Sequence, residues 1–133
     1  MGDKIFRIEV ITRPERLELL KEALHGIRVT GMTVSQVFGC GLSGGFREVY
    51  RGQEVQINLL PKVKIEIVVC EVTVDEVIEA VNSVCRTGEI GDGKIFVSEI
   101  LNAVRIRTGE QGPAAIMDRD DEKDIVEERL KGK

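Results

Sequence analysis

The order in which extended and helical patterns alternate along the chain constrains its fold more than any other feature. Residues 4–11 have the alternation of a half-buried strand, residues 12–27 have helical spacing, and residues 32–38 are extended again. Thr12 as a cap and Pro14 in the first turn predict where the helix begins. The apolar positions that carry the first two patterns are Phe6, Ile8 and Val10, then Leu17, Leu20, Leu24 and Ile27.

The same pattern then repeats. Residues 56–70 are a long strand, residues 74–84 a helix, residues 87–93 a loop, and residues 94–97 and 102–107 are extended. An order of β-α-β, long connection, β-α-β predicts an α+β fold, the ferredoxin-like duplication with an antiparallel sheet and two helices on one face. Because the other face of such a sheet is left bare, we expect the chain to form oligomers. The apolar positions of the repeat are Val63, Ile65, Ile67 and Val69, then Val74, Val77, Ile78, Val81 and Val84.

The length of 133 residues suits one domain, which we place at residues 1–117. A charged tail, residues 118–133, follows the Gly112-Pro113 break and holds seven acidic and five basic side chains. Its sparse apolar positions, Ile125, Val126 and Leu130, predict a short, solvated helix. We assign the tail no function at this point.

Charge and cysteine usage exclude several classes of protein. The net charge of −4 argues against a nucleic-acid partner, and the three cysteines without CxxC spacing and one histidine, His25, argue against a zinc site or a disulfide scaffold. There is no signal-peptide pattern and no apolar run of about 18 residues. We therefore expect a soluble, cytoplasmic chain with reduced thiols.

Two glycine-rich segments are candidates for binding. Residues 39–52, GCGLSGGFREVYRG, could be a phosphate cradle, a linker or an arm for a protein partner. Residues 87–94, TGEIGDGK, could turn backbone N–H groups and Lys94 toward an anion, or could be an ordinary connection. Arg105 and Arg107, placed on one face of an expected strand, favour the anion because paired guanidiniums suit phosphate.

The expected strand at residues 56–70 has Lys62, Lys64 and Glu66 on the face opposite its apolar residues, which predicts the wet side of the sheet. Residues 87–94 and the pair Arg105 and Arg107 could lie beside this face only if neighbouring subunits approach one another. No nucleophile–base pair is present, so we expect a protein that is not an enzyme.

Several separated motifs in a fixed order resemble the PII signal-transduction family, over about residues 4–116. They are IRVTGMTV (27–34), LPKVKIEIVV (60–69), TGEIGDGKIFV (87–97) and RIRTGE (105–110). The resemblance implies a homotrimer that binds ATP or ADP between subunits and, with Mg, 2-oxoglutarate, and so reports energy, carbon and nitrogen status.

Carried over by position, the resemblance implies a set of nucleotide-binding residues. Arg105 and Arg107 would come from the adjoining subunit, Ser43 would ligate Mg, and Ser43 with Lys62 would hold 2-oxoglutarate. The nucleotide-binding residues implied are Thr33, Gly39, Gly41, Glu66, Val68, Thr87, Gly91, Asp92, Gly93, Lys94, Arg105 and Arg107.

The connection between the repeats, about residues 39–57, would be the T-loop, which docks on targets such as an ammonium transporter and so recruits the protein to the membrane. Its partner-binding residues would be Phe46, Arg47, Tyr50 and Arg51. Val55 stands where the family has its modified tyrosine, Gln53 where some members have a phosphorylated serine, and Ser43 and Leu42 replace a glutamine and a basic residue.

These departures keep an alternative open: a regulator that responds to nucleotide alone, or a PII-like sensor of another small molecule. Both alternatives leave the glycine-rich nucleotide motif unchanged.

Overall fold

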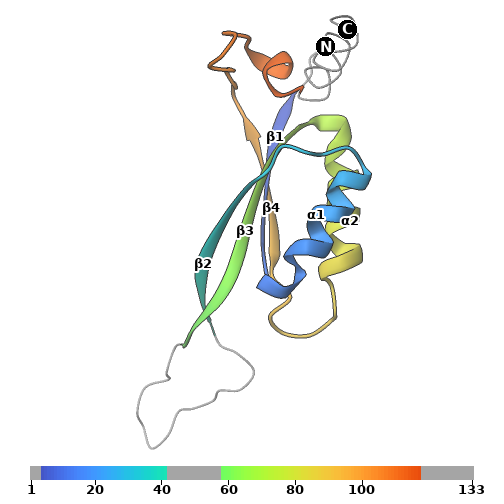
Figure 1. The fold of residues 1–133 in the computed structure, drawn as a ribbon, viewed down its shortest axis with the longest axis vertical. Helices are drawn as coiled ribbons and strands as arrows, with labels where there is room; N and C mark the ends of the chain where they lie inside the picture. Colours follow the sequence, from blue (N-terminus) through green and yellow to red (C-terminus); the bar gives the residue numbers. More distant parts are fainter. Residues whose placement is uncertain (1–3, 42–57, 118–133) are drawn as a thin grey trace, which may run out of the picture.

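The computed structural model describes residues 4–41 and 58–117. The elements of these residues follow the expected duplicated order (Figure 1). In chain order they are β1 (Ile5–Thr12), η1 (Pro14–Arg16), α1 (Leu17–Gly26), β2 (Thr33–Gly41), β3 (Asn58–Cys70), η2 (Glu71–Thr73), α2 (Val74–Cys85), β4 (Lys94–Ile100) and η3 (Gly112–Ile116), where η marks a 3-10 helix.

The strands form one antiparallel sheet in the order β2-β3-β1-β4. Figure 1 shows α1 and α2 side by side on one face of this sheet. The α+β class, the ferredoxin-like order and the single helical layer are therefore confirmed.

The core lies between the sheet and the two helices. Val63, Ile65 and Ile67 of β3 are at most 4% exposed, and they pack with Leu20 and Leu24 of α1 and with two valines of α2. Burying each such side chain stabilises the fold by about 1.5–3 kcal/mol. The alternation expected for residues 56–70 is confirmed over the described part of β3.

The opposite face of the sheet is polar, as expected. Glu9 of β1 lies directly opposite Glu66 of β3, an arrangement of like charges that is unfavourable on its own. Lys64 lies 3.9 Å from Glu9, and Arg7 lies 3.9 Å from Glu66, so each carboxylate has a cation beside it. The charges on this open face are thus balanced, and neither α1 nor α2 covers it.

One sequence-based expectation about the start of the first helix was wrong. Thr12 does not cap a helix: it is the buried last residue of β1, and its hydroxyl donates to the Asp92 carbonyl over 2.8 Å. Pro14 does sit in the first turn, but that turn is the 3-10 helix η1.

Residues 102–107 are not a strand. They enter a turn in which the Arg105 N–H donates to the Glu110 carbonyl, while the Gly109 N–H donates back to the Arg105 carbonyl. The only ladder contact of this segment among the described residues is the isolated bridge between Val104 and Gln111. The preceding strand, β4, is longer than expected and runs to Ile100.

Candidate functional site

The loop between α2 and β4 folds around one carboxylate. Asp92 accepts hydrogen bonds from the Thr87 N–H (2.7 Å), the Gly88 N–H (2.8 Å) and the Thr87 hydroxyl (2.5 Å). The Thr87 hydrogen bonds, followed by the Arg13 guanidinium, hold the pKa of the Asp92 carboxyl far below its usual range. Residues 87–93, called here the Asp92 loop, are therefore fixed by an ionised side chain at their own end.

Two cations, one just after β1 and one in β3, hold this loop. Arg13 follows β1, and its guanidinium bonds the Asp92 carboxylate with one nitrogen and the Ile90 carbonyl (2.9 Å) with another. Lys62 of β3 donates from Nζ to the Gly91 carbonyl over 2.9 Å. The loop is thus tied to two strands that are far from it in the sequence.

Sequence reasoning missed Thr12 and Arg13. Both bond Asp92, which lies 80 residues from Thr12 and 79 from Arg13, and only the register that pairs Ile11 with Lys94 brings them to the loop. Only a β1–β4 register deduced from the expected fold could have shown that these two residues contact the loop.

Glycine is required at the end of the Asp92 loop for two reasons. Gly91 and Gly93 have φ of 104° and 108°, a conformation that side chains disfavour. A Cβ on Gly93 would also lie 1.9 Å from the Ile11 carbonyl oxygen. The chain therefore passes directly over the β1 backbone before it enters β4.

The same end of the sheet holds the first residues of the expected T-loop. Gly39 of β2 lies against Lys62, with its ideal Cβ position 3.3 Å from Lys62 Cγ, and Gly41 pairs with Asn58 at the end of the ribbon. Figure 1 shows this ribbon and the Asp92 loop at one end of the molecule. The partner-loop and effector residues predicted at Ser43, Phe46, Arg47, Tyr50 and Arg51 lie outside the described residues.

A second group of predicted residues lines a hollow on the open face of the sheet. Thr33, Glu66 and Val68 line this hollow of about 550 Å³ together with Arg7 and Ile116. We call it the open-face hollow. The apolar wall of this hollow could pack against a flat ring, and the carboxylate beside it could accept hydrogen bonds from an amino group on that ring.

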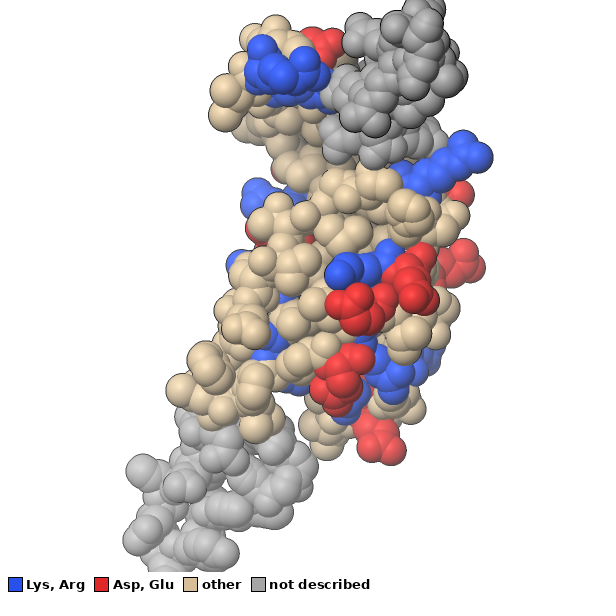
Figure 2. Space-filling model, viewed as in Figure 1, with Lys and Arg blue, Asp and Glu red and all other residues tan. Residues whose placement is uncertain are grey.

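The segment at residues 102–107, which holds Arg105 and Arg107, lies at the opposite end of the molecule from the Asp92 loop (Figure 1). Arg105 pairs with Glu110 at 3.4 Å and donates to the Ala115 carbonyl at 3.0 Å. Figure 2 shows basic side chains gathered over this segment. Because the segment is a turn and not a strand, the expectation of two guanidiniums on one strand face was wrong.

Within one chain, the structure does not bring this segment to the start of β4, where Lys94 lies (Figure 1). In the described part of the chain no three His, Cys, Asp or Glu side chains form a cluster that could hold a metal. Among the same residues, no helix is long and apolar enough to cross a membrane.

The fold and the site define a ferredoxin-like protein with a clamped glycine loop near the end of the sheet where β2 and β3 reach Gly41 and Asn58. The family model for the nitrogen regulatory protein P-II matches residues 5–110, and the chain belongs to that family. The resemblance noted in the sequence is confirmed.

Relatives agree with this membership. The chain is 49% identical to the nitrogen regulatory PII-like protein of Bacillus subtilis over 116 residues, which are 87% of this chain and all of that protein. It is 48% identical to GlnK of Escherichia coli K12 over 109 residues, 82% of this chain and 97% of GlnK. These relatives are named regulatory proteins.

Two solved structures are similar in fold. B. subtilis GlnK superposes with a TM-score of 0.72 at 50% identity, covering 84% of this chain and 98% of that one. A B. subtilis GlnK–ATP complex gives the same TM-score at 46% identity, covering 84% and 95%.

Proposed function

We propose that the chain is a non-enzymatic nitrogen-regulatory protein that binds ATP or ADP, with the phosphates at residues 87–94 and the adenine in the open-face hollow. The observation that carries the proposal is the Asp92 loop. Its glycines leave the backbone uncovered, its shape is fixed before a ligand arrives, and Lys94 follows it at the start of β4. The solved complex of a relative with ATP supports the choice of ligand.

The site is proposed to lie between subunits of a homotrimer. Arg105 and Arg107 are at the far end of the same chain, so a second copy must supply them if they are to meet phosphates at the Asp92 loop. The uncovered open face of the sheet provides a surface for such an assembly.

Separate Lys94→Ala and Arg105→Ala variants should each weaken ADP binding by about tenfold or more, because each removes a charge-assisted contact to phosphate. Isothermal titration calorimetry measures the change. Lys21→Ala is the matched control, since Lys21 pairs with Glu18 on α1, away from the site. Unchanged affinity in both variants contradicts the proposed site.

The two variants also test whether the site is shared. If trimers are refolded from an equal mixture of the two, about one quarter of the interfaces should combine an intact loop with an intact arginine and bind at the parent affinity. A site within one subunit would show no such recovery.

We further propose that Lys62 holds a carboxylate of 2-oxoglutarate in the presence of Mg-ATP. Its amine is already at the Asp92 loop, 2.9 Å from the Gly91 carbonyl, and is therefore placed beside the proposed phosphate site. Lys62→Ala should abolish 2-oxoglutarate binding in calorimetry with Mg-ATP, while ADP affinity falls less than it does in Lys94→Ala.

The second candidate is a regulator that responds to nucleotide alone, favoured by Ser43 and Leu42 in the sequence. It predicts tight ADP binding and no heat of 2-oxoglutarate binding in the parent protein. A screen of other small metabolites with Mg-ATP then decides whether another effector takes its place.

The proposed output is regulation of a partner through residues 39–57 in the cytoplasm, with recruitment to the membrane by an ammonium transporter. Arg51→Ala should reduce co-purification with that transporter while leaving ADP affinity unchanged. Binding by the variant equal to the parent would contradict the proposed contact.

A further inference from the structure

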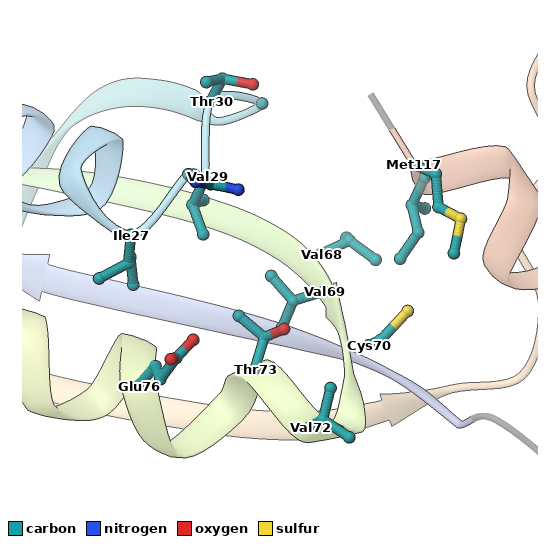
Figure 3. A pocket seen from close by; sticks show the side chains of 13 residues that line it. Ile27, Val29, Thr30, Val68, Val69, Cys70, Val72, Thr73, Glu76 and Met117 are labelled. Carbon is teal, nitrogen blue, oxygen red and sulfur yellow. The ribbon is translucent and has the colours of Figure 1, made fainter. Parts of the chain in front are cut away.

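A pocket of about 490 Å³ lies at the end of β3, next to the open-face hollow and on the other side of their shared wall. Its walls come from the segment after α1, the last residues of β3, η2 and the end of η3 (Figure 3). We call it the β3-end pocket. The residues that line it are Ile27, Arg28, Val29, Thr30, Gly31, Val68, Val69, Cys70, Val72, Thr73, Glu76, Ile116 and Met117.

The surface of this pocket is mixed, with polar side chains such as Arg28, Thr73 and Glu76 beside apolar ones, and part of its apolar surface is open to solvent in the described chain. Val72 is 86% exposed and Met117 is 43% exposed, although both are large apolar side chains. Figure 3 shows Val68, Val69 and Cys70 lying between Met117 on one side and Thr73 and Glu76 on the other. Covering such a surface is favourable in proportion to the apolar area removed from water.

The chain itself continues from the rim of the pocket. Ile116 and Met117 are part of its wall, and the sixteen residues of the tail, 118–133, follow directly. The eight residue-to-residue steps from Met117 to Ile125 can span at most about 29 Å, which is more than enough to turn back over the pocket. A segment tethered at the rim is present there at a high effective concentration, about millimolar for a short flexible tether.

The composition of the tail matches such an occupant. Ile125, Val126 and Leu130 are its apolar residues, and Val126 and Leu130 have i, i+4 spacing. The remaining residues are charged apart from Gly132, so these apolar side chains are the part of the tail that gains from leaving water. All of the B. subtilis relative is covered by 116 residues of this chain, so the chain is longer than that protein by more than the length of the tail.

We propose that the tail folds back and inserts Val126 and Leu130 into the β3-end pocket. Gly31, Val68 and Ile116 line both this pocket and the open-face hollow, so the docked tail lies behind the wall of the hollow. Given the proposed nucleotide function, the tail is then a built-in support for the adenine side of that site.

The thiol of Cys70 reports on the occupancy of the pocket. Cys70 is half-buried and lines the pocket, and labelling by a maleimide is measured in a Cys40→Ser background because Cys40 is exposed. Burial raises the pKa of the Cys85 thiol, which leaves that cysteine poorly reactive. Nucleotide is left out, so the result is independent of whether the proposed nucleotide site exists.

The test variant is Val126→Ser with Leu130→Ser, and its matched control is Lys123→Ser with Glu127→Ser, which has the same spacing and no net change of charge. Labelling of Cys70 should be about tenfold faster or more in the test variant than in the parent, with the control like the parent. A chain ending at Met117 should label as fast as the test variant. Equal rates in all four proteins would overturn the proposal, and are expected if a second subunit, a small molecule or nothing occupies the pocket.

Discussion

Replacement of Gly93 by alanine is expected to destabilise the protein by about 3 kcal/mol and to abolish nucleotide binding. Two costs add: about 1–2 kcal/mol for a side chain at a φ of 108°, and about 1–3 kcal/mol for overpacking against the Ile11 carbonyl, 1.9 Å from the new Cβ. Relief of the clash requires the start of β4 to move away from β1. The movement displaces Lys94 and Asp92, which flank the glycine.

Gly88→Ala separates these two costs. Gly88 is in the same loop with a φ of 88°, but no atom lies within 4 Å of its ideal Cβ. It should therefore lose only the conformational share, about 1–2 kcal/mol. Urea unfolding at one fixed protein concentration measures both variants. Equal losses would show that the contact with Ile11 is not maintained in solution.

Replacement of Asp92 by asparagine is expected to open the loop without disturbing the core. The side chain accepts from the Thr87 N–H, the Thr87 hydroxyl and the Gly88 N–H, and it pairs with Arg13. An amide has one acceptor oxygen in place of two and no charge, so at least one donor loses its acceptor. Faster hydrogen exchange at Thr87 and Gly88, with unchanged exchange in β3, is the expected signature.

Lowering the pH should also open the Asp92 loop in the parent protein. The folded-state pKa of Asp92 is lowered, so its ionised form contributes stability above the unfolded pKa, about 3.9. That contribution is lost as the pH falls below about 3.9 toward the folded-state value. The parent should therefore lose more stability between pH 6 and 3 than Asp92→Asn does. Glu22→Gln, on the exposed side of α1, is the control that should behave like the parent.

The sequence was sufficient for the architecture because both repeats carry clear apolar periodicities. Val63, Ile65 and Ile67 alternate with charged residues, and this pattern survives in the structure as one buried and one open face. The lengths of strands were less predictable. β4 continues to Ile100 because β1 offers it partners as far as Ile5, and the pairing partner is not part of the local sequence.

The segment at residues 102–107 shows how a period-two pattern can mislead. Arg105, Ile106 and Arg107 alternate as in a strand, but Ile106 is 97% exposed and the backbone of Arg105 bonds to Glu110 in a turn. No second strand is available at that end of the sheet among the described residues, so the alternation has no ladder to join.

The candidate site was predictable only in part. The glycines and Lys94 were evident from the motif, whereas Thr12 and Arg13 act through contacts that span most of the chain. Local sequence preferences predicted that Thr12 caps a helix. In the tertiary structure its hydroxyl donates to the Asp92 carbonyl instead. Sites assembled from distant strand ends are the part of a fold that short-range patterns do not reveal.

The pairing of Gly41 with Asn58 has an evolutionary consequence. It brackets sixteen residues, 42–57, with a single cross-strand pair at the end of the long β2–β3 ribbon. The entropy of closing such a segment changes slowly with its length, by about 0.6 kcal/mol for each doubling. Insertions, deletions and whole replacements between these two residues therefore leave the scaffold almost equally stable. Given the proposed role of residues 39–57 in docking, descendants of this chain can change the partner they bind without having to evolve a new fold.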